Sequence, residues 1–357
     1  MELFKLNTPS YTPGPTISDF DTLIWTERYK SYGEFELHVK NDISILNVLP
    51  FNTLISHNRT YQVMIVENHE VVRDEKKNLL IKISGRTFET FAENRPTVGA
   101  DSGLYNSSTG AAIVETITDT PENVAKQLFV NKMVSPTASA SDAIPNFDVK
   151  KEIRVPDTSA SHVIRRGDTY TRAMEILNIC DAGIKTSRPH DSQTTLDLII
   201  HDGADRSTSV IFYAQNADLE SAQYFWSNKP YKNYAQISAH TAVRTYRHRD
   251  LSSDVTGLNR RVKYVEADDL EGAFSPPLST DAMATRAQSV LDANKQITIV
   301  QAKIATTAKP RFKSNYDVGD LVGVFGEFSV AQTMRVTEHI LTIDDKGIRG
   351  YPALSAV

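Results

Sequence analysis

The sequence predicts a mainly β protein with an α+β middle region: two small antiparallel β-barrel-like domains and one mixed α/β domain. Three observations support this class. Short segments in which apolar and polar residues alternate with period two occur near both ends of the chain. Turn residues separate these segments at close spacing, which favours a small barrel or sandwich over a parallel βαβ arrangement. Helical patterns with capping signals cluster between them.

Composition limits the class of protein further. With 357 residues and 40% hydrophobic content, the chain can form two or three domains with substantial cores. The formal net charge of -5 argues against a nucleic-acid binder, because neutralising phosphates needs a basic face. No segment approaches the roughly 20 apolar residues of a membrane span, and the N-terminus lacks the features of a signal peptide. The single cysteine, Cys180, excludes an internal disulfide and is expected to be a buried thiol.

Residues 1–97 are expected to form the first β-barrel-like domain. Leu23, Ile24 and Trp25 form a short apolar run. The alternation of Phe35, Leu37 and Val39 with polar residues predicts a half-buried strand after it. Further strands are expected at residues 52–57, 61–67 and 79–84, with a charged hairpin tip at 73–77. A turn at Ser84, Gly85 and Arg86 is expected to lead into a short helix that buries Phe88 and Phe91.

Residues 98–225 and 271–311 are expected to form the mixed α+β middle domain. A helical pattern covers residues 109–118, and a second helix is expected to start at Thr120 and Pro121. Asp168 is the predicted cap of the clearest helix, which is expected to end at Gly183. Residues 135–142 are small and polar and predict an exposed loop.

A β-hairpin is expected at the end of this region. Leu196, Leu198 and Ile200 alternate with polar residues, and Val210 and Phe212 continue the alternation after the sequence DGADRS. Asp202 and Gly203 supply residue types that favour a turn.

Residues 226–270 and 312–357 are expected to form the second β-barrel-like domain. Strands are predicted at residues 233–245, 259–266 and 334–343, and the last of these pairs with 347–351. Asp317, Gly319 and Asp320 stand at the entrance of a further strand. A helix at residues 281–293 interrupts this domain, and 271–311 is expected to fold onto the middle domain.

A search for chemistry finds no catalytic, cofactor-binding or metal-binding residues, and no cofactor is predicted. The nine histidines are scattered without ligand spacing, and nucleotide-binding and hydrolase motifs are missing. Cys180 with His162 or His190 lacks a protease signature. Three acidic pairs could serve a glycosidase or a calcium site but at turns are more often solvated; they are Asp268 with Asp269, Asp344 with Asp345, and Asp317 with Asp320.

Three blocks of the sequence resemble one known family. The first block contains ISDFDTLIWTERYKSYGEFELHV, YQVMIVE and LLIKISGRTFETFAENR, and the third is YDVGD. The second block comprises Gly203, Asp205, Arg206, Ser207, Val210, Phe212, Asp218, Leu219, Lys232, Asn233 and Ala235. Together they resemble the tail hub proteins of siphophages (baseplate hub or tail-associated proteins), whose fold is related to the central hub of contractile-tail baseplates. Residues 134–155 match no part of this family's pattern.

The resemblance implies a structural virion protein and not an enzyme. Such a protein forms a homotrimeric ring at the distal end of the phage tail, assembled in the host cytoplasm. The ring joins the sixfold tail tube to the threefold tail tip and lets DNA pass during ejection without binding it specifically. Its implied partners are the distal tail protein ring, the tape-measure protein and the tail-tip or receptor-binding proteins.

The alternative is a cell-wall-directed hydrolase or a carbohydrate-binding module of a phage tail. Hub proteins of this wider group often carry such a domain at the C-terminus. Because Val357 follows directly after the last predicted strand, no such domain is expected here.

Overall fold

The structure is a computed structural model. It describes residues 1–73, 78–97, 115–136, 140–164, 166–190, 193–238, 245–249, 256–266, 280–295, 297–327 and 331–357. Chain contacts divide the molecule into two compact units. The large unit comprises Met1–Ser221, Ala302–Ser355 and Val357, and the small unit comprises Ala222–Gln301 and Ala356. These boundaries differ from the predicted ones, and the three-domain division stays a prediction.

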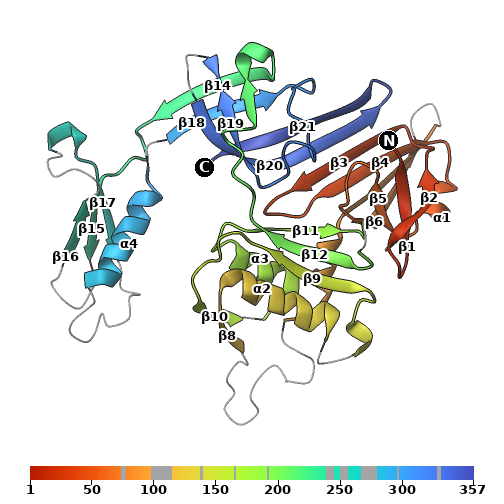
Figure 1. The fold of residues 1–357 in the computed structure, drawn as a ribbon, viewed down its shortest axis with the longest axis horizontal. Coiled ribbons are helices and arrows are strands. Elements are labelled where there is room, and N and C mark those ends of the chain that lie inside the picture. The colour runs from red at the N-terminus through yellow and green to blue at the C-terminus, as the bar shows by residue number, and fades with distance from the viewer. Residues whose placement is uncertain are drawn as a thin grey trace, which may run out of the picture. The chain divides into compact units, whose positions relative to one another are not determined.

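An eleven-stranded sheet dominates the large unit (Figure 1). Its strands follow one another by hydrogen bonding in the order β13 (Ile211–Tyr213), β19 (Leu321–Phe325), β20 (Ala331–Asp344), β3 (Thr22–Arg28), β4 (Glu34–Lys40), β7 (Leu79–Thr87), β6 (Met64–Arg73), β5 (Leu54–His57), β1 (Leu3–Asn7) and β2 (Thr12–Ile17). Strand β21 (Gly347–Ala356) pairs with β20 outside this path. Short helical segments lie next to the sheet strands; they are α1 (Ile45–Val48), η1 (Phe88–Asn94) and η5 (Ala214–Asn216).

The pairing of β3 with β20 joins the two ends of the chain in one sheet. The strands run antiparallel, with Leu23 opposite Ile343 and Arg28 opposite Glu338. The mainly β class is therefore confirmed. The expected barrels are not closed in the part of the chain that the structure describes, because the strand path runs from β13 to β2 without returning.

A mixed α+β layer lies beside this sheet in the large unit (Figure 1). Strand β12 (Leu196–His201) lies between β11 (Gly183–Ser187) and β9 (Phe147–Glu152). Helices α2 (Pro121–Phe129) and α3 (Thr169–Leu177) pack on one another and bury their apolar faces in the same core. The remaining elements are β8 (Glu115–Asp119) paired with β10 (Ala160–Ile164), η3 (Val130–Val134) and η4 (Ala140–Asp142).

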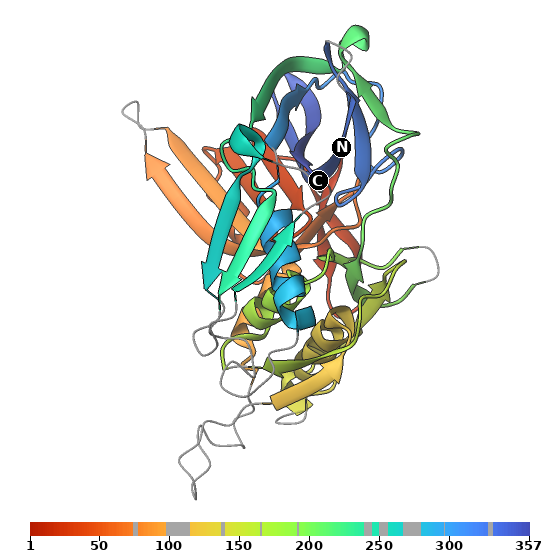
Figure 2. The same cartoon turned by 90° about the vertical axis from the view of Figure 1, so that its left-hand side faces the viewer.

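The small unit is a three-stranded sheet with a helix packed on it (Figure 2). Strand β15 (Tyr234–Ser238) is central, and β16 (Thr245–Arg249) and β17 (Val262–Glu266) flank it. Helix α4 (Thr280–Asp292), which the sequence predicts, packs against β15 and β16. The other elements are η6 (Gly257–Asn259) and the paired strands β14 (Leu219–Ser227) and β18 (Ile297–Ile304), which carry the chain between the units.

Several predicted elements match the structure because their local signals are strong. The alternation at Phe35, Leu37 and Val39 gives β4, whose apolar side chains are buried and whose polar ones are not. Asp168 caps α3 by accepting the backbone N–H of Thr171 at 2.7 Å. The antiparallel hairpin of β6 and β7 forms as expected, and most of its predicted tip lies outside the described residues.

The predicted hairpin at 196–214 is wrong. Strand β12 pairs in parallel with β9 and antiparallel with β11, so both of its edges are occupied and all six of its residues are buried. Strand β13 instead pairs in parallel with β19 in the large sheet. The DGADRS segment therefore carries the chain from one sheet to another.

Three further boundaries need correction. The end of the predicted helix at 109–118 is strand β8, where the β-branched residues Thr116, Ile117 and Thr118 favour an extended backbone; residues 98–114 lie outside the described part. Helix α3 ends at Leu177, because the chain reverses before Gly183 opens β11. Ser84, Gly85 and Arg86 belong to β7 and form no turn.

Among the described helices, none has the length and hydropathy required to span a membrane.

Candidate functional site: two interlocked turns and an ion network

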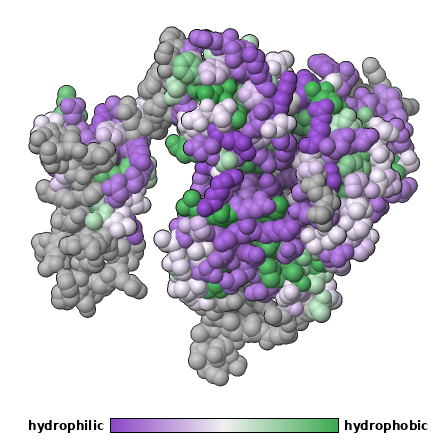
Figure 3. All heavy atoms as spheres, in the orientation of Figure 1, coloured by the Kyte–Doolittle hydropathy of each residue, from purple (hydrophilic) through white to green (hydrophobic). Residues whose placement is uncertain are grey.

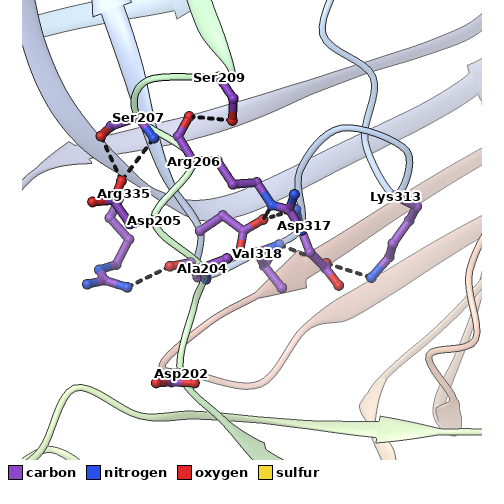
Figure 4. A network of polar contacts seen from close by, with 12 residues as sticks. Asp202, Ala204, Asp205, Arg206, Ser207, Ser209, Lys313, Asp317, Val318 and Arg335 are labelled. Atoms are coloured by element: carbon purple, nitrogen blue, oxygen red, sulfur yellow. Dashed lines mark hydrogen bonds and ion pairs between the residues drawn. The ribbon is translucent and has the colours of Figure 1, made fainter. Parts of the chain in front are cut away.

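The DGADRS and YDVGD segments meet in space (Figure 4). Leu321 donates its backbone N–H to Ala204 O at 2.8 Å, and Arg206 donates its backbone N–H to Leu321 O at 2.8 Å. Asp205 and Leu321 form an isolated parallel bridge. The link between the mixed layer and β13 is thereby fixed against the entrance of β19. We call this pair of turns, residues 202–209 and 317–321, the clamp.

Two glycines allow the backbones of the clamp to touch. A Cβ atom on Gly203 would lie 1.7 Å from Gly319 O and 2.0 Å from Gly319 C, which no real side chain tolerates. Gly319 has φ +93, and a Cβ there would lie 2.5 Å from the ring of Tyr29. Tyr29 is buried and donates its hydroxyl to Asp181 O at 2.6 Å, so its ring is held in place.

The carboxylate of Asp320 binds both turns. It is almost fully buried and accepts the backbone N–H of Ala204 at 2.7 Å and Nε of Arg206 at 2.8 Å. It also accepts the backbone N–H of Asp317 at 2.9 Å. These three donors satisfy a charge that would otherwise be costly to bury.

An ion network continues from the clamp into the sheet. Lys313 Nζ lies 2.7 Å from Asp317 Oδ1 and 3.0 Å from Glu27 Oε2, and Lys185 Nζ lies 3.2 Å from Asp317 Oδ2. Burial alone would raise the pKa of Asp317, but Lys313 and Lys185 hold it well below its usual range. Burial alone would lower the pKa of Lys313, but Glu27 and Asp317 hold it well above its usual range. Asp317 and Lys313 therefore stay charged, and each is paired with two groups of opposite charge in this network.

Three buried histidines surround this network. Burial, with a smaller effect of neighbouring cations, lowers the pKa of His57, His201 and His339 to about 3 each. The His201 ring packs edge-on against Tyr29, and the His339 ring stacks on Phe312 with 3.7 Å between centroids. All three are neutral at physiological pH.

Two cavities border these groups. One of about 430 Å³ lies beside the clamp, lined by Lys185, His201, Asp202, Arg206 and Asp320 among others. The other, of about 220 Å³, is lined by Trp25 and Glu27 of β3, by His339 and Leu341 of β20, and by residues between 304 and 316.

The geometry favours a structural role for the clamp over catalysis. A glycosidase needs one protonated and one ionised carboxyl group, whereas Asp317 and Asp320 are both held by cations or N–H donors. Within the described ranges, His, Cys, Asp and Glu form no group suited to hold a metal ion. The arrangement ties two turns from different parts of the chain into one rigid junction.

The other sequence candidates lie apart from the clamp. Asp344 at the end of β20 pairs with Arg349 of β21 across the turn between these strands, and Asp268 with Asp269 lies outside the described residues. Cys180 is half buried in the core of the mixed layer, and burial raises the pKa of its thiol. His190 lies against the ring of Tyr61.

Sequence analysis missed Glu27, Lys313 and the three buried histidines. A signal for Glu27 was present, because period two places it on the same face of β3 as Leu23 and Trp25. A buried acid on an apolar face implies a cation within ion-pair distance of it. Nothing local indicates that Lys313 is that cation.

Comparison with known proteins gives a consistent result. The model of the family described as "Siphovirus ReqiPepy6 Gp37-like protein" matches residues 5–353. A search of curated proteins found no match.

Solved structures of tail proteins share the fold at low sequence identity. The 43 kDa tail protein of prophage MuSo2 from Shewanella oneidensis aligns with a TM-score of 0.62 at 12% identity, covering 99% of this chain and 97% of that one. A tail protein from Neisseria meningitidis MC58 aligns with a TM-score of 0.58 at 11% identity, covering 99% and 96%. The Escherichia coli c3393 protein, described as a type VI secretion component with structural similarity to the T4 tail proteins gp27 and gp5, aligns with a TM-score of 0.50 at 8% identity, covering 100% and 77%.

Proposed function

The chain belongs to the Siphovirus ReqiPepy6 Gp37-like family of phage tail proteins, and from this we propose that it is the hub at the distal end of the tail. In this role it forms a homotrimeric ring that joins the sixfold tail tube to the threefold tip and lets DNA pass. The observation that carries the proposal is the β3 and β20 pairing, which makes one continuous sheet from β strands at the two ends of the chain. We call β1–β7 the first β block, and β13 with β19–β21 the last β block. A trimer with two such β blocks per chain can present six similar faces.

The ends of the sheet suggest how the ring closes. The strand path ends in β2 of the first block and in β13 of the last block, and β21 is a further edge. A head-to-tail contact between the first block of one subunit and the last block of the next closes by rotation. Strand β2 contains Pro13 and Pro15, which lack backbone N–H groups, so this contact is made through side chains and does not extend the sheet.

The polar surface of the large unit is suited to contacts between subunits that are made through side chains. Hydrophilic residues cover most of the face of the large unit drawn in Figure 3, and hydrophobic ones occur there in small separate groups. Polar interfaces are typical of assemblies whose parts fold first and associate later. The proposed neighbours are the distal tail protein ring, the tape-measure protein and tail-tip or receptor-binding proteins.

The inner wall of the ring is expected to be acidic or neutral. A basic channel would bind the DNA that it must release, because phosphate contacts dominate affinity for DNA. The net charge of -5 is in keeping with this expectation. A positive potential along the lumen of an assembled ring would contradict it.

No catalytic role is proposed, and the hydrolase alternative is open to a direct test. The purified chain should release neither reducing sugar nor peptide from peptidoglycan or polysaccharide. Release that is lost in Asp317→Asn or Asp320→Asn would overturn the structural role.

The position in the virion is tested by labelling. An antibody against this chain, imaged on intact virions by electron microscopy, should bind at the distal end of the tail. Averaging of the labelled tip without imposed symmetry should show threefold density for this chain. Labelling along the tube, or sixfold density for this chain, would refute the hub proposal.

A further inference from the structure

The 220 Å³ cavity of the large unit contains buried hydrogen-bond donors without acceptors. Trp25 and His57 both line it, and both are almost fully buried. Among the described residues, neither Trp25 Nε1 nor His57 Nε2 has a hydrogen-bond partner. An unsatisfied buried donor is costly, so each of these N–H groups requires an acceptor that the fold itself does not supply.

The tautomer of His57 is set by the hydrogen bond at its Nδ1 atom. Arg59 donates its backbone N–H to His57 Nδ1 at 3.2 Å, which makes Nδ1 the acceptor and places the ring hydrogen on Nε2. The ring lies edge-on to Trp25 with 4.7 Å between centroids, so the two N–H groups belong to adjoining rings in one wall. Both free groups are donors.

The charge around the cavity is positive. Arg59 and Arg311 line it, and their guanidinium groups have no hydrogen bond or ion pair within the described ranges. The one acid in the lining, Glu27, is already bound by Lys313. The cavity therefore offers unpaired donors and cations but no free carboxylate.

The remaining walls are largely apolar. Phe312, Leu341, Ile348 and Pro352 line the cavity together with Tyr316. Such walls favour a monoanion with an apolar body over a doubly charged phosphate, which is more costly to desolvate. Two neighbouring acceptor oxygens also match the planar fork of an arginine.

We propose that this cavity binds a carboxylate group attached to a small apolar body. Trp25 and His57 donate to its oxygens, and Arg59 and Arg311 neutralise its charge. The carboxylate comes either from a free small molecule or from an acidic side chain of a polypeptide. This inference is independent of the proposed place in the tail.

Trp25 provides the signal for a binding test. The sequence has one other tryptophan, Trp226, so the Trp226→Phe variant reports on Trp25 alone. Titration with benzoate at constant ionic strength should change the Trp25 fluorescence saturably, and the neutral analogue benzamide and inorganic phosphate should not. In ¹H–¹⁵N spectra the indole N–H of Trp25 should move downfield as it gains an acceptor.

Variants and a peptide pair complete the test. In the Trp226→Phe background, Arg59→Gln and Arg311→Gln should each weaken benzoate binding by about tenfold, whereas Arg73→Gln, at an exposed arginine on β6, should leave it unchanged. A short peptide with one Glu is compared with its Gln twin. Binding of benzoate identifies free carboxylates as ligands, and binding of the Glu peptide alone identifies a polypeptide source. Binding of neither ligand, equal binding of benzamide or phosphate, or unchanged affinity in both arginine variants would overturn the proposal.

Discussion

At the scale of single residues, close backbone contacts and buried charges decide which substitutions a position tolerates. Gly203 and Gly319 let two turns touch, and Asp320 satisfies the donors that they bring together. Glu89 shows the opposite case, a fully buried carboxyl group with one hydrogen bond from Thr186 at 2.7 Å and a second oxygen without a partner. These positions support two predictions.

Gly203→Ala is expected to prevent the clamp from forming. The added Cβ would collide with the backbone of Gly319, which has no room to move against Tyr29. Gly347→Ala is the control for backbone strain without a collision, because its φ of +99 is unfavourable for alanine but nothing lies within 4 Å of the new atom. Thermal unfolding should show a much larger loss of stability for Gly203→Ala, and equal losses in the two variants would contradict the contact.

Glu89→Gln is expected to stabilise the protein above pH 6. Burial raises the pKa of Glu89 to about 6. The folded state therefore binds the proton more tightly than the unfolded state, and this group costs stability as pH rises from about 4.5 to 6. The gain of the variant over wild type in denaturant unfolding should grow from near zero at pH 4 to roughly 2 kcal/mol at pH 7. A gain that does not depend on pH would argue against this assignment.

At the scale of elements, the sequence predicts most strands and helices but not their partners. Strand β4 and helices α2, α3 and α4 carry local signals, namely alternation, caps and apolar spacing, and their presence was predicted correctly, although α3 ends earlier than expected. The pairing of β12 was predicted wrongly, because alternation does not reveal that both edges of a strand are occupied. The junction of the clamp could not be predicted either, since more than a hundred residues separate Arg206 from Asp320.

The clamp is expected to stabilise the junction of the sheets through Asp320. Asp320→Asn keeps the shape but removes the charge and replaces one acceptor oxygen by a donor, which should cost about 3 kcal/mol. Asp205→Asn is the control, because Asp205 is exposed and bonds only Ser207 within its own turn. Hydrogen exchange should show faster opening of β13 and β19 in Asp320→Asn. Similar exchange in the two variants would exclude a role in holding the turns together.

At the scale of the whole molecule, three buried histidines make the stability of the large unit depend on pH. His57, His201 and His339 come from three different strands or strand ends of the large unit. The charge of Lys313 helps to lower the pKa of all three, so acid is expected to destabilise the region that they share. In the proposed ring, the sheet edges that are exposed in one chain would be covered by the neighbouring subunit.

Acid is expected to destabilise the large unit below pH 6.5. Each of the three histidines has its pKa lowered to about 3, so the unfolded state binds more protons as pH falls from 6.5 to 3. The free energy of unfolding is unaffected by these histidines above pH 6.5. Below that pH it falls, by up to roughly 2 kcal/mol per histidine at pH 5. His201→Gln should make the loss between pH 7 and 5 smaller than in wild type, whereas His38→Gln, at a half-buried histidine bonded to Glu36, should not. An unchanged acid profile in His201→Gln would contradict the burial effect.

The mass of the purified protein in solution tests the hub proposal most directly. Native mass spectrometry, together with light scattering at high protein concentration, should give a particle of three times the 39.8 kDa chain mass. A threefold average of that particle should place the two β blocks of each chain about one sixth of a turn apart around the ring axis. A stable monomer or dimer at high concentration, with two β blocks that do not superpose, would contradict the hub proposal.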